Sequence, residues 1–388
     1  MSIYRMRFAE THTFLSWLRQ LVCQHGLGSS TITGRIDSSP ISISHQPNMV
    51  LQTSQPSGLV RKLRPFAAVA VCSAFLIAYL PAARANSTTT TQEVYTGREV
   101  ANDSVWTAKM RERIGPASPE AVDAFRSVGV NEISSKMLSD EEWGLVKRAL
   151  SRLPKLHRCV LTNHLRRLSF LDLPPGLGSA LVSRNEVEDA EPSFDITLRA
   201  SLLDQTLTEF LNEKEAHLFE EDGSGVQVRL DAGSTDALSY ALLHEATHIL
   251  DEVLNISVSE EGFRSEAWLS EHDLAEPFVS SLAASTFFRQ GPKIPQRSAS
   301  SYYKALKKTP FVSFYSTASA YEDLAELVAW QQLDFQLDQP LTVTVQDKNG
   351  VTQFEYAPLK QPLIQERFRQ LQEFLNDHKA ACGNATED

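Results

Sequence analysis

DAGSTDALSYALLHEATHILDEVL, residues 231–254, is the stretch of sequence that decides the fold. Its apolar residues recur at helical spacing, so we predict an amphipathic helix with Ser234 or Thr235 as the N-cap. The helix contains the motif HEATH, in which His244 and His248 are four positions apart and share one face, where two ring nitrogens can meet one tetrahedral metal ion. Glu245 is rotated by about 100° from His244, where its carboxylate can take a proton from water.

A catalytic zinc site needs a third protein ligand and an open fourth position. The third histidine of the metzincins is missing, because Asp251 and Leu254 stand where that longer motif has Gly and His. We therefore expect a carboxylate from another helix, and Glu322 in the segment YEDLAEL is the leading candidate. The alternatives are Glu266 and Glu271, which follow the HEATH motif by 18 and 23 positions.

Two side chains near Glu322 have suitable spacing for supporting roles. Glu326 lies one helical turn after Glu322 and can accept the outer hydrogen bond of a ligating imidazole, which fixes the tautomer of that ring. Tyr315 stands seven residues before Glu322. Its phenol can donate a hydrogen bond to the oxyanion that forms when water attacks a carbonyl.

The chain contains HExxH and, later, the pattern Tyr, six residues, Glu, two residues, Ala, Glu. This combination resembles the catalytic domain of anthrax lethal factor and, more loosely, the Mlc titration factor peptidases. Both are zinc peptidases of the gluzincin type. The resemblance covers residues 190–335 and implies an insertion at about residues 280–301, because 74 positions separate His248 from Glu322. It implies His244, His248 and Glu322 as zinc ligands, Glu245 as the general base, Tyr315 as the transition-state donor and Glu326 as the outer carboxylate.

Residues 1–85 differ in charge from the rest, with eight Lys or Arg against two Asp or Glu. Basic residues at 61–64 precede the apolar run FAAVAVCSAFLIAYL and a small-x-small site that ends at Ala85, which is typical of a cleaved signal peptide over about residues 49–85. The run is too short for a stable membrane span. Cys159 and Cys382 remain after cleavage, and the sequence leaves open whether they form a disulfide.

The remaining chain divides into a solvated linker at 86–117, a helical support region at 118–190, a zincin-like domain at 191–376 and a tail at 377–388. We expect an α+β fold, mainly helical, with an active-site helix and a small sheet. Two alternating strands, FDITL and VQVRL, precede the HEATH helix, and TVTVQDKNGVTQFEY predicts a later hairpin. VQVRL is the expected edge for pairing with an extended substrate.

These observations together predict an exported zinc metallopeptidase, periplasmic or secreted, that acts on a peptide or protein. The formal charge of −11 argues against nucleic acid as a partner, because like charges repel. Two alternatives stay open at this point. One is an envelope protein that holds zinc for binding or regulation without hydrolysis, and the other is a hydrolase of cell-wall amide bonds.

Overall fold

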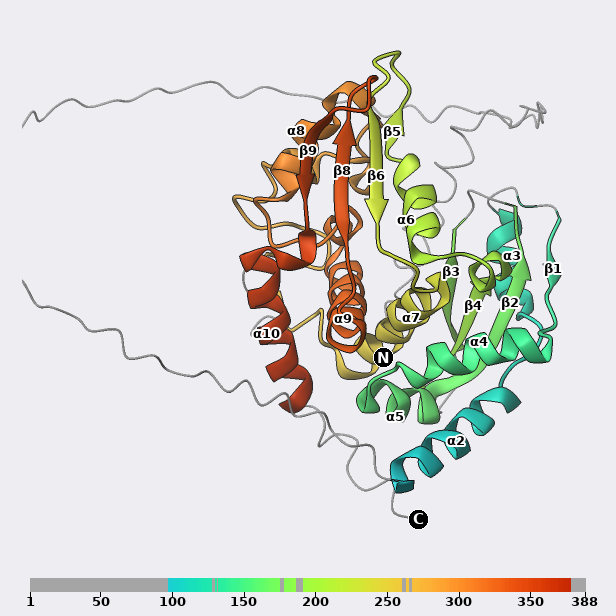
Figure 1. Cartoon of the computed structure of the whole chain (residues 1–388). Helices are drawn as coiled ribbons and strands as arrows, with labels where there is room; N and C mark the ends of the chain where they lie inside the picture. Colours follow the sequence, from blue (N-terminus) through green and yellow to red (C-terminus); the bar gives the residue numbers. More distant parts are fainter. Residues whose placement is uncertain are drawn as a thin grey trace, which may run out of the picture. The chain divides into compact units, whose positions relative to one another are not determined.

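The computed structural model describes residues 97–127, 130, 132–174, 178–185, 191–259, 263–264 and 267–377, all of which belong to one compact unit (Figure 1). The predicted signal peptide, the first part of the expected linker and the tail beyond Asp377 lie outside these residues. Among the residues described, no helix combines the length and apolar character that crossing a lipid bilayer requires. Cys159 is disulfide-bonded, and the other cysteines of the chain are outside the described residues.

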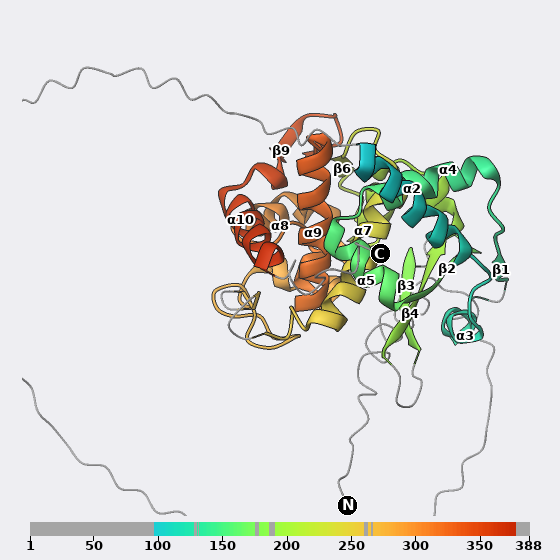
Figure 2. The ribbon, with the colours of Figure 1, turned by 90° about the horizontal axis from the view of Figure 1, so that it is seen from below.

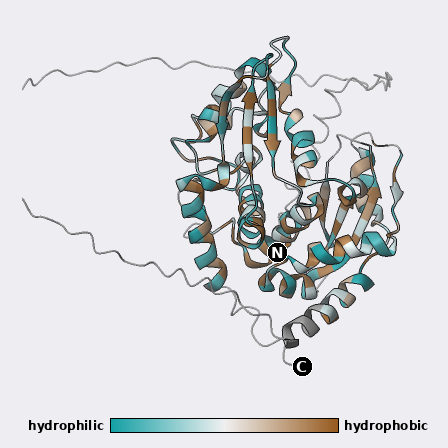
Figure 3. Cartoon of the chain, viewed as in Figure 1, coloured by the Kyte–Doolittle hydropathy of each residue, from teal (hydrophilic) through white to brown (hydrophobic). Residues whose placement is uncertain are grey.

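The architecture is mixed α and β, and its larger sheet has the strand order β1-β2-β4-β3. Its strands are β1 (Ser134–Ser135), β2 (Leu165–Asp172), β3 (Ala180–Asn185) and β4 (Ser193–Arg199). β2 and β4 are parallel, whereas β3 pairs antiparallel with β4 and is the last strand of the sheet on that side among the described residues. Six of the seven β4 residues are buried, as expected for a strand inside a sheet. Figure 3 shows apolar residues, in brown, along the strands of this sheet.

Helix α7 (Ala237–Leu254) carries the HEATH motif and is buried around most of its circumference. Its N-cap is Asp236, which accepts from the Ser239 N–H at 2.7 Å, so the expected caps Ser234 and Thr235 are wrong by one or two positions. The helix ends at Asn255, whose φ of 55° is left-handed. Helices α9 (Ala320–Leu337) and α5 (Lys155–His164) both pack against α7, and Figure 2 shows the three helices next to one another.

A second, three-stranded sheet lies over a separate apolar cluster and has the order β6-β8-β9. Its strands are β6 (Gln227–Asp231), β8 (Thr342–Gln346) and β9 (Thr352–Tyr356), so the predicted hairpin and both strands before α7 are confirmed. In the hairpin turn, Asp347 Oδ1 accepts from the Asn349 and Val351 N–H groups, and Gly350 has a φ of 78°. The other helices and short strands are α2 (Gly97–Glu112), α3 (Pro119–Ser127), α4 (Asp140–Ser151), α6 (Leu207–Ala216), α8 (Ala299–Leu306), α10 (Pro362–Asp377), β5 (Phe219–Glu220) and β7 (Ile294–Pro295).

Two parts of the predicted organisation need correction. The expected linker at 86–117 contains the helix α2. The expected helical layer at 118–190 does contain α3, α4 and α5, but it also contains the strands β1, β2 and β3. In β2 the run from Leu168 to Leu171 is buried on both faces, and a short apolar run without alternation does not distinguish a strand from a buried helix. The expected boundary at residue 190 falls between β3 and β4, which pair along their length, so the two regions share one sheet.

Candidate metal centre

The HEATH histidines and Glu322 converge where α7 packs against α9. His244 Nε2 is 3.0 Å from Glu322 Oε2 and 3.2 Å from His248 Nε2, and His248 Nε2 is 3.5 Å from Glu322 Oε2. Ligands at about 2.0–2.1 Å from a tetrahedral zinc ion are about 3.4 Å from one another. The three side chains therefore fit a single small cation, and they are the only group of this kind among the described residues.

The electrostatics of these groups favour positive charge at the same point. Burial lowers the pKa of His248, but the adjacent Glu322 carboxylate outweighs burial and raises that pKa to about 9. Burial raises the pKa of Glu322, but His248 and His244 outweigh burial and hold that pKa well below its usual range. Glu322 is therefore ionised and can bind either a proton-bearing imidazole or a metal ion.

Glu326 lies behind His244, as its spacing predicts, although the expected hydrogen bond is not formed. Its Oε1 is 3.6 Å from His244 Nδ1, and that buried nitrogen has no hydrogen-bond partner. The Glu326 carboxylate accepts from Ser313 Oγ at 2.8 Å, from Trp330 Nε1 at 3.4 Å and from the Tyr240 hydroxyl. An orphaned Nδ1 facing a carboxylate fits an imidazole whose Nε2 binds a metal and whose Nδ1 carries the proton.

Glu245 and Tyr315 both lie next to the ligand cluster. Both line the pockets next to His244. Burial raises the pKa of the Glu245 carboxyl, which brings it closer to the range of a useful general base. The Tyr315 ring stacks on His244 with 5.9 Å between ring centroids, and burial together with the nearby Glu322 carboxylate raises its pKa well above the usual value, so its phenol keeps the proton it would donate.

A pocket of about 260 Å³ exposes the centre to solvent, and strand β3 forms one of its walls. Ala180, Leu181, Val182 and Arg184 line it together with the two histidines and Glu322. No residue of β6 lines this pocket, because β6 pairs with β8 in the other sheet. The expectation that VQVRL forms the edge beside the site is therefore wrong, and the strand in that position is β3.

Glu271, Asp251 and the histidine His157 are not part of the ligand cluster. Glu271 lines the same pocket but is not part of the ligand group, and Glu266 is outside the described residues. His157 is buried with its Nε2 3.0 Å from Thr247 Oγ1, and burial lowers its pKa to about 3. Asp251 accepts from the Ser257 N–H at 2.7 Å at the end of α7 and is not a ligand.

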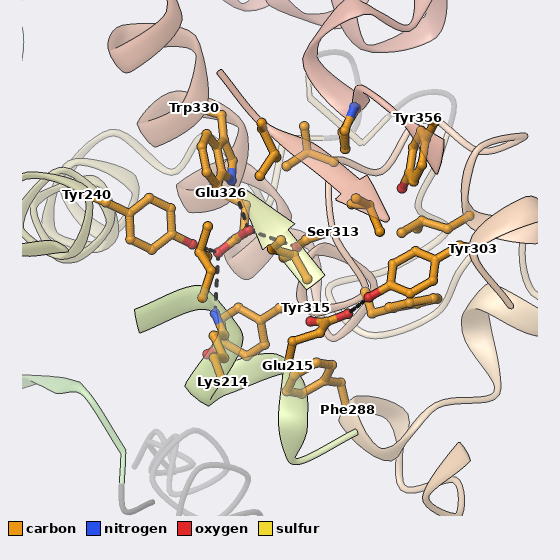
Figure 4. Close-up of a pocket in the computed structure, with 18 residues that line it drawn as sticks. Lys214, Glu215, Tyr240, Phe288, Tyr303, Ser313, Tyr315, Glu326, Trp330 and Tyr356 are labelled. Atoms are coloured by element: carbon orange, nitrogen blue, oxygen red, sulfur yellow. Dashed lines mark hydrogen bonds and ion pairs between the residues drawn. The ribbon is translucent and has the colours of Figure 1, made fainter. Parts of the chain in front are cut away.

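A second layer of polar residues was not anticipated from the sequence. Figure 4 shows Tyr240, Ser313 and Lys214 directed toward Glu326 around a small cavity of about 30 Å³. Tyr240 precedes His244 by four residues, so helical spacing could have identified it. Lys214 has no such signal, because it comes from α6, and only the packing of α6 against α7 places it there.

Glu215, the neighbour of Lys214, accepts a hydrogen bond from the Tyr303 hydroxyl (Figure 4). Burial raises the pKa of Glu215 from 4.5 to about 7, despite the opposing effects of Tyr303 and Lys214. Between pH 4.5 and about 7, Glu215 is therefore protonated in the folded protein and ionised in the unfolded chain. The free energy of unfolding should therefore fall by about 2–3 kcal/mol as the pH rises from about 4.5 to 7.

Urea unfolding of the metal-free protein across pH 4.5–7.5 measures this change. Glu215→Gln, which keeps a hydrogen-bond acceptor for Tyr303 but cannot ionise, should be less sensitive to pH over that range. Glu220→Gln, a change at an exposed position on β5, is the matched control and should follow the wild type. An identical pH dependence in wild type and Glu215→Gln would show that Glu215 has an unperturbed pKa.

Comparison with protein-family models, with curated proteins and with solved structures finds no significant match to this chain.

Proposed function

We propose that this protein is a zinc-dependent metallopeptidase of the gluzincin type. The observation that supports this most directly is the convergence of His244, His248 and Glu322 with 3.0–3.5 Å between their ligand atoms, beside a pocket open to solvent. Glu245 and Tyr315 are the groups that hydrolysis requires next to such a centre. The larger fold is proposed to be zincin-like, with α7 as the active-site helix.

His244, His248 and Glu322 would hold the zinc ion, which when bound supplies a Lewis acid that polarises the scissile carbonyl and makes water more acidic. Glu245 takes the proton from the attacking water and passes it to the leaving amine. Tyr315 donates its phenolic proton in a hydrogen bond to the developing oxyanion. Glu326, 3.6 Å from His244 Nδ1, is the carboxylate that would fix the tautomer of His244 when the metal is bound.

Strand β3 is the proposed docking edge for an extended polypeptide. It lines the pocket and has no strand partner on its outer side among the described residues. An unpaired edge offers N–H and C=O groups to a peptide in β conformation, which favours a peptide or protein as the substrate. Export to the periplasm or medium remains the proposal drawn from residues 49–85.

The test measures zinc and peptide cleavage on the same purified protein. We expect about one zinc ion per chain, and cleavage of a peptide library that a chelator abolishes and added zinc restores. Glu322→Ala should weaken zinc binding by more than about 100-fold, since loss of even an outer hydrogen-bond partner costs about 10- to 100-fold. Glu271→Ala removes a carboxylate from the same pocket and should keep the zinc.

The alternatives give different results in this experiment. Stoichiometric zinc without hydrolysis of any amide substrate would indicate a zinc-holding binding or regulatory protein. Hydrolysis of peptidoglycan fragments but not of polypeptides would indicate a cell-wall amide hydrolase. Full zinc content in Glu322→Ala would contradict the proposed ligand set.

A further inference from the structure

Lys214 lies beside Tyr315 and points toward Glu326 (Figure 4). Its Nζ lies 3.6 Å from the centroid of the Tyr315 ring and 3.5 Å from Glu326 Oε1. The side chain is only 23% exposed, so water screens these contacts weakly. One ammonium group therefore contacts both an aromatic ring and a buried carboxylate.

Both partners lie against His244, the Tyr315 ring on the face of the imidazole and Glu326 beside Nδ1, the nitrogen that points away from Glu322. The Tyr315 ring stacks on the His244 ring, and Glu326 Oε1 is 3.6 Å from His244 Nδ1. We infer that Lys214 is a positioning residue of the proposed peptidase, which holds the Tyr315 phenol and the Glu326 carboxylate in their working places. This inference rests on the proposed function and assigns Lys214 no contact with the reacting atoms.

The charges around Glu326 explain why a cation is needed there. The side chain of Glu326 is 2% exposed, and a buried carboxylate is costly unless it is paired. Ser313, Tyr240 and Trp330 offer only neutral donors. Without Lys214 the carboxylate would lose its closest cation and would either move toward water or take a proton. In both cases it would orient His244 less well.

Tyr315 depends on Lys214 for a different reason. A cation over the face of an aromatic ring attracts its electron density, most strongly where water is excluded. The Lys214 ammonium therefore holds the Tyr315 ring on one face. Phe288 packs edge-on against the same ring, with 5.0 Å between the ring centroids. A loosely held phenol would donate less well to the developing oxyanion, so the transition state would lose stabilisation.

The test compares zinc-loaded wild type with Lys214→Met, Lys214→Arg and a control, Lys304→Met. Lys304 lies over the Phe354 ring at 5.8 Å to the centroid, so its removal deletes a similar contact away from the centre. With zinc at saturating concentration, we expect Lys214→Met to lower kcat by about tenfold or more, with KM changed less than about twofold. Lys214→Arg should restore part of the lost kcat, and Lys304→Met should match wild type.

A second measurement needs neither zinc nor activity. Urea unfolding of the metal-free single variants Lys214→Met and Glu326→Gln and of the double variant should show non-additive effects, because the two groups interact directly. Should Lys214→Met not fold, Lys214→Gln replaces it, since glutamine keeps a donor without the charge.

The outcomes separate the two proposals. Cleavage by wild type with unchanged kcat in Lys214→Met would overturn the role of Lys214 alone. A rise only in KM, or strictly additive unfolding energies, would also overturn it. Wild type that holds zinc but cleaves no peptide would remove the proposed function, and the inference for Lys214 would fall with it.

Discussion

Glu245→Gln should abolish peptide cleavage and leave the zinc content unchanged. The carboxylate lies beside the ligand cluster in the pocket wall but is not one of its three members, so the amide should not disturb metal binding. Glutamine has nearly the same shape but cannot accept a proton from water. General base catalysis contributes about 10²- to 10⁴-fold, so kcat/KM should fall by at least about 100-fold.

The control for this variant is Glu252→Gln, which removes a carboxylate from the same helix and the same pocket. Glu252 is ion-paired with Arg184 near the end of α7, so its loss should change kcat/KM little. Zinc content and peptide hydrolysis are measured on both variants in parallel. Retained cleavage in Glu245→Gln would rule out Glu245 as the general base, even if the variant binds zinc as expected.

Asp323→Ala should lower the free energy of unfolding by about 3–5 kcal/mol, the cost of leaving one member of a buried ion pair alone. Asp323 is completely buried in the first turn of α9 and accepts two hydrogen bonds from Arg367, at 2.9 and 2.8 Å. Trp268 Nε1 donates a third hydrogen bond at 2.9 Å. These contacts tie the start of α9 to α10 and hold it in the position that brings Glu322 to the histidines.

Denaturant unfolding of the metal-free protein measures this effect, and Glu366→Ala is its control. Glu366 pairs with Arg369 on the exposed face of α10, where solvent screens the ion pair, so the change should be much smaller. The double variant Asp323→Leu with Arg367→Leu should recover much of the lost stability, because it leaves no unpaired charge. An effect of Asp323→Ala no larger than that of Glu366→Ala would mean that the buried pair contributes little.

Local periodicity identified the elements that carry the centre. α7, α9, β4, β6 and the β8–β9 hairpin all follow from spacing or turn residues that neighbour one another in sequence. β2 was wrongly expected to be helical. Whether Leu168–Leu171 forms a strand or a helix depends on the neighbouring elements that bury both of its faces. The same limit applies to β3, whose place beside the pocket depends on its pairing with β4.

The motif HEATH by itself determined that His244 and His248 share a helical face, because an i, i+4 relation is a property of the helix alone. The spacing of Tyr315, Glu322 and Glu326 likewise needed only the sequence. That Glu322 comes within 3.0 Å of His244, and that Lys214 contacts both Tyr315 and Glu326, was decided by the tertiary structure. Contacts between residues far apart in the chain follow from how α6, α7 and α9 pack, which no local pattern encodes.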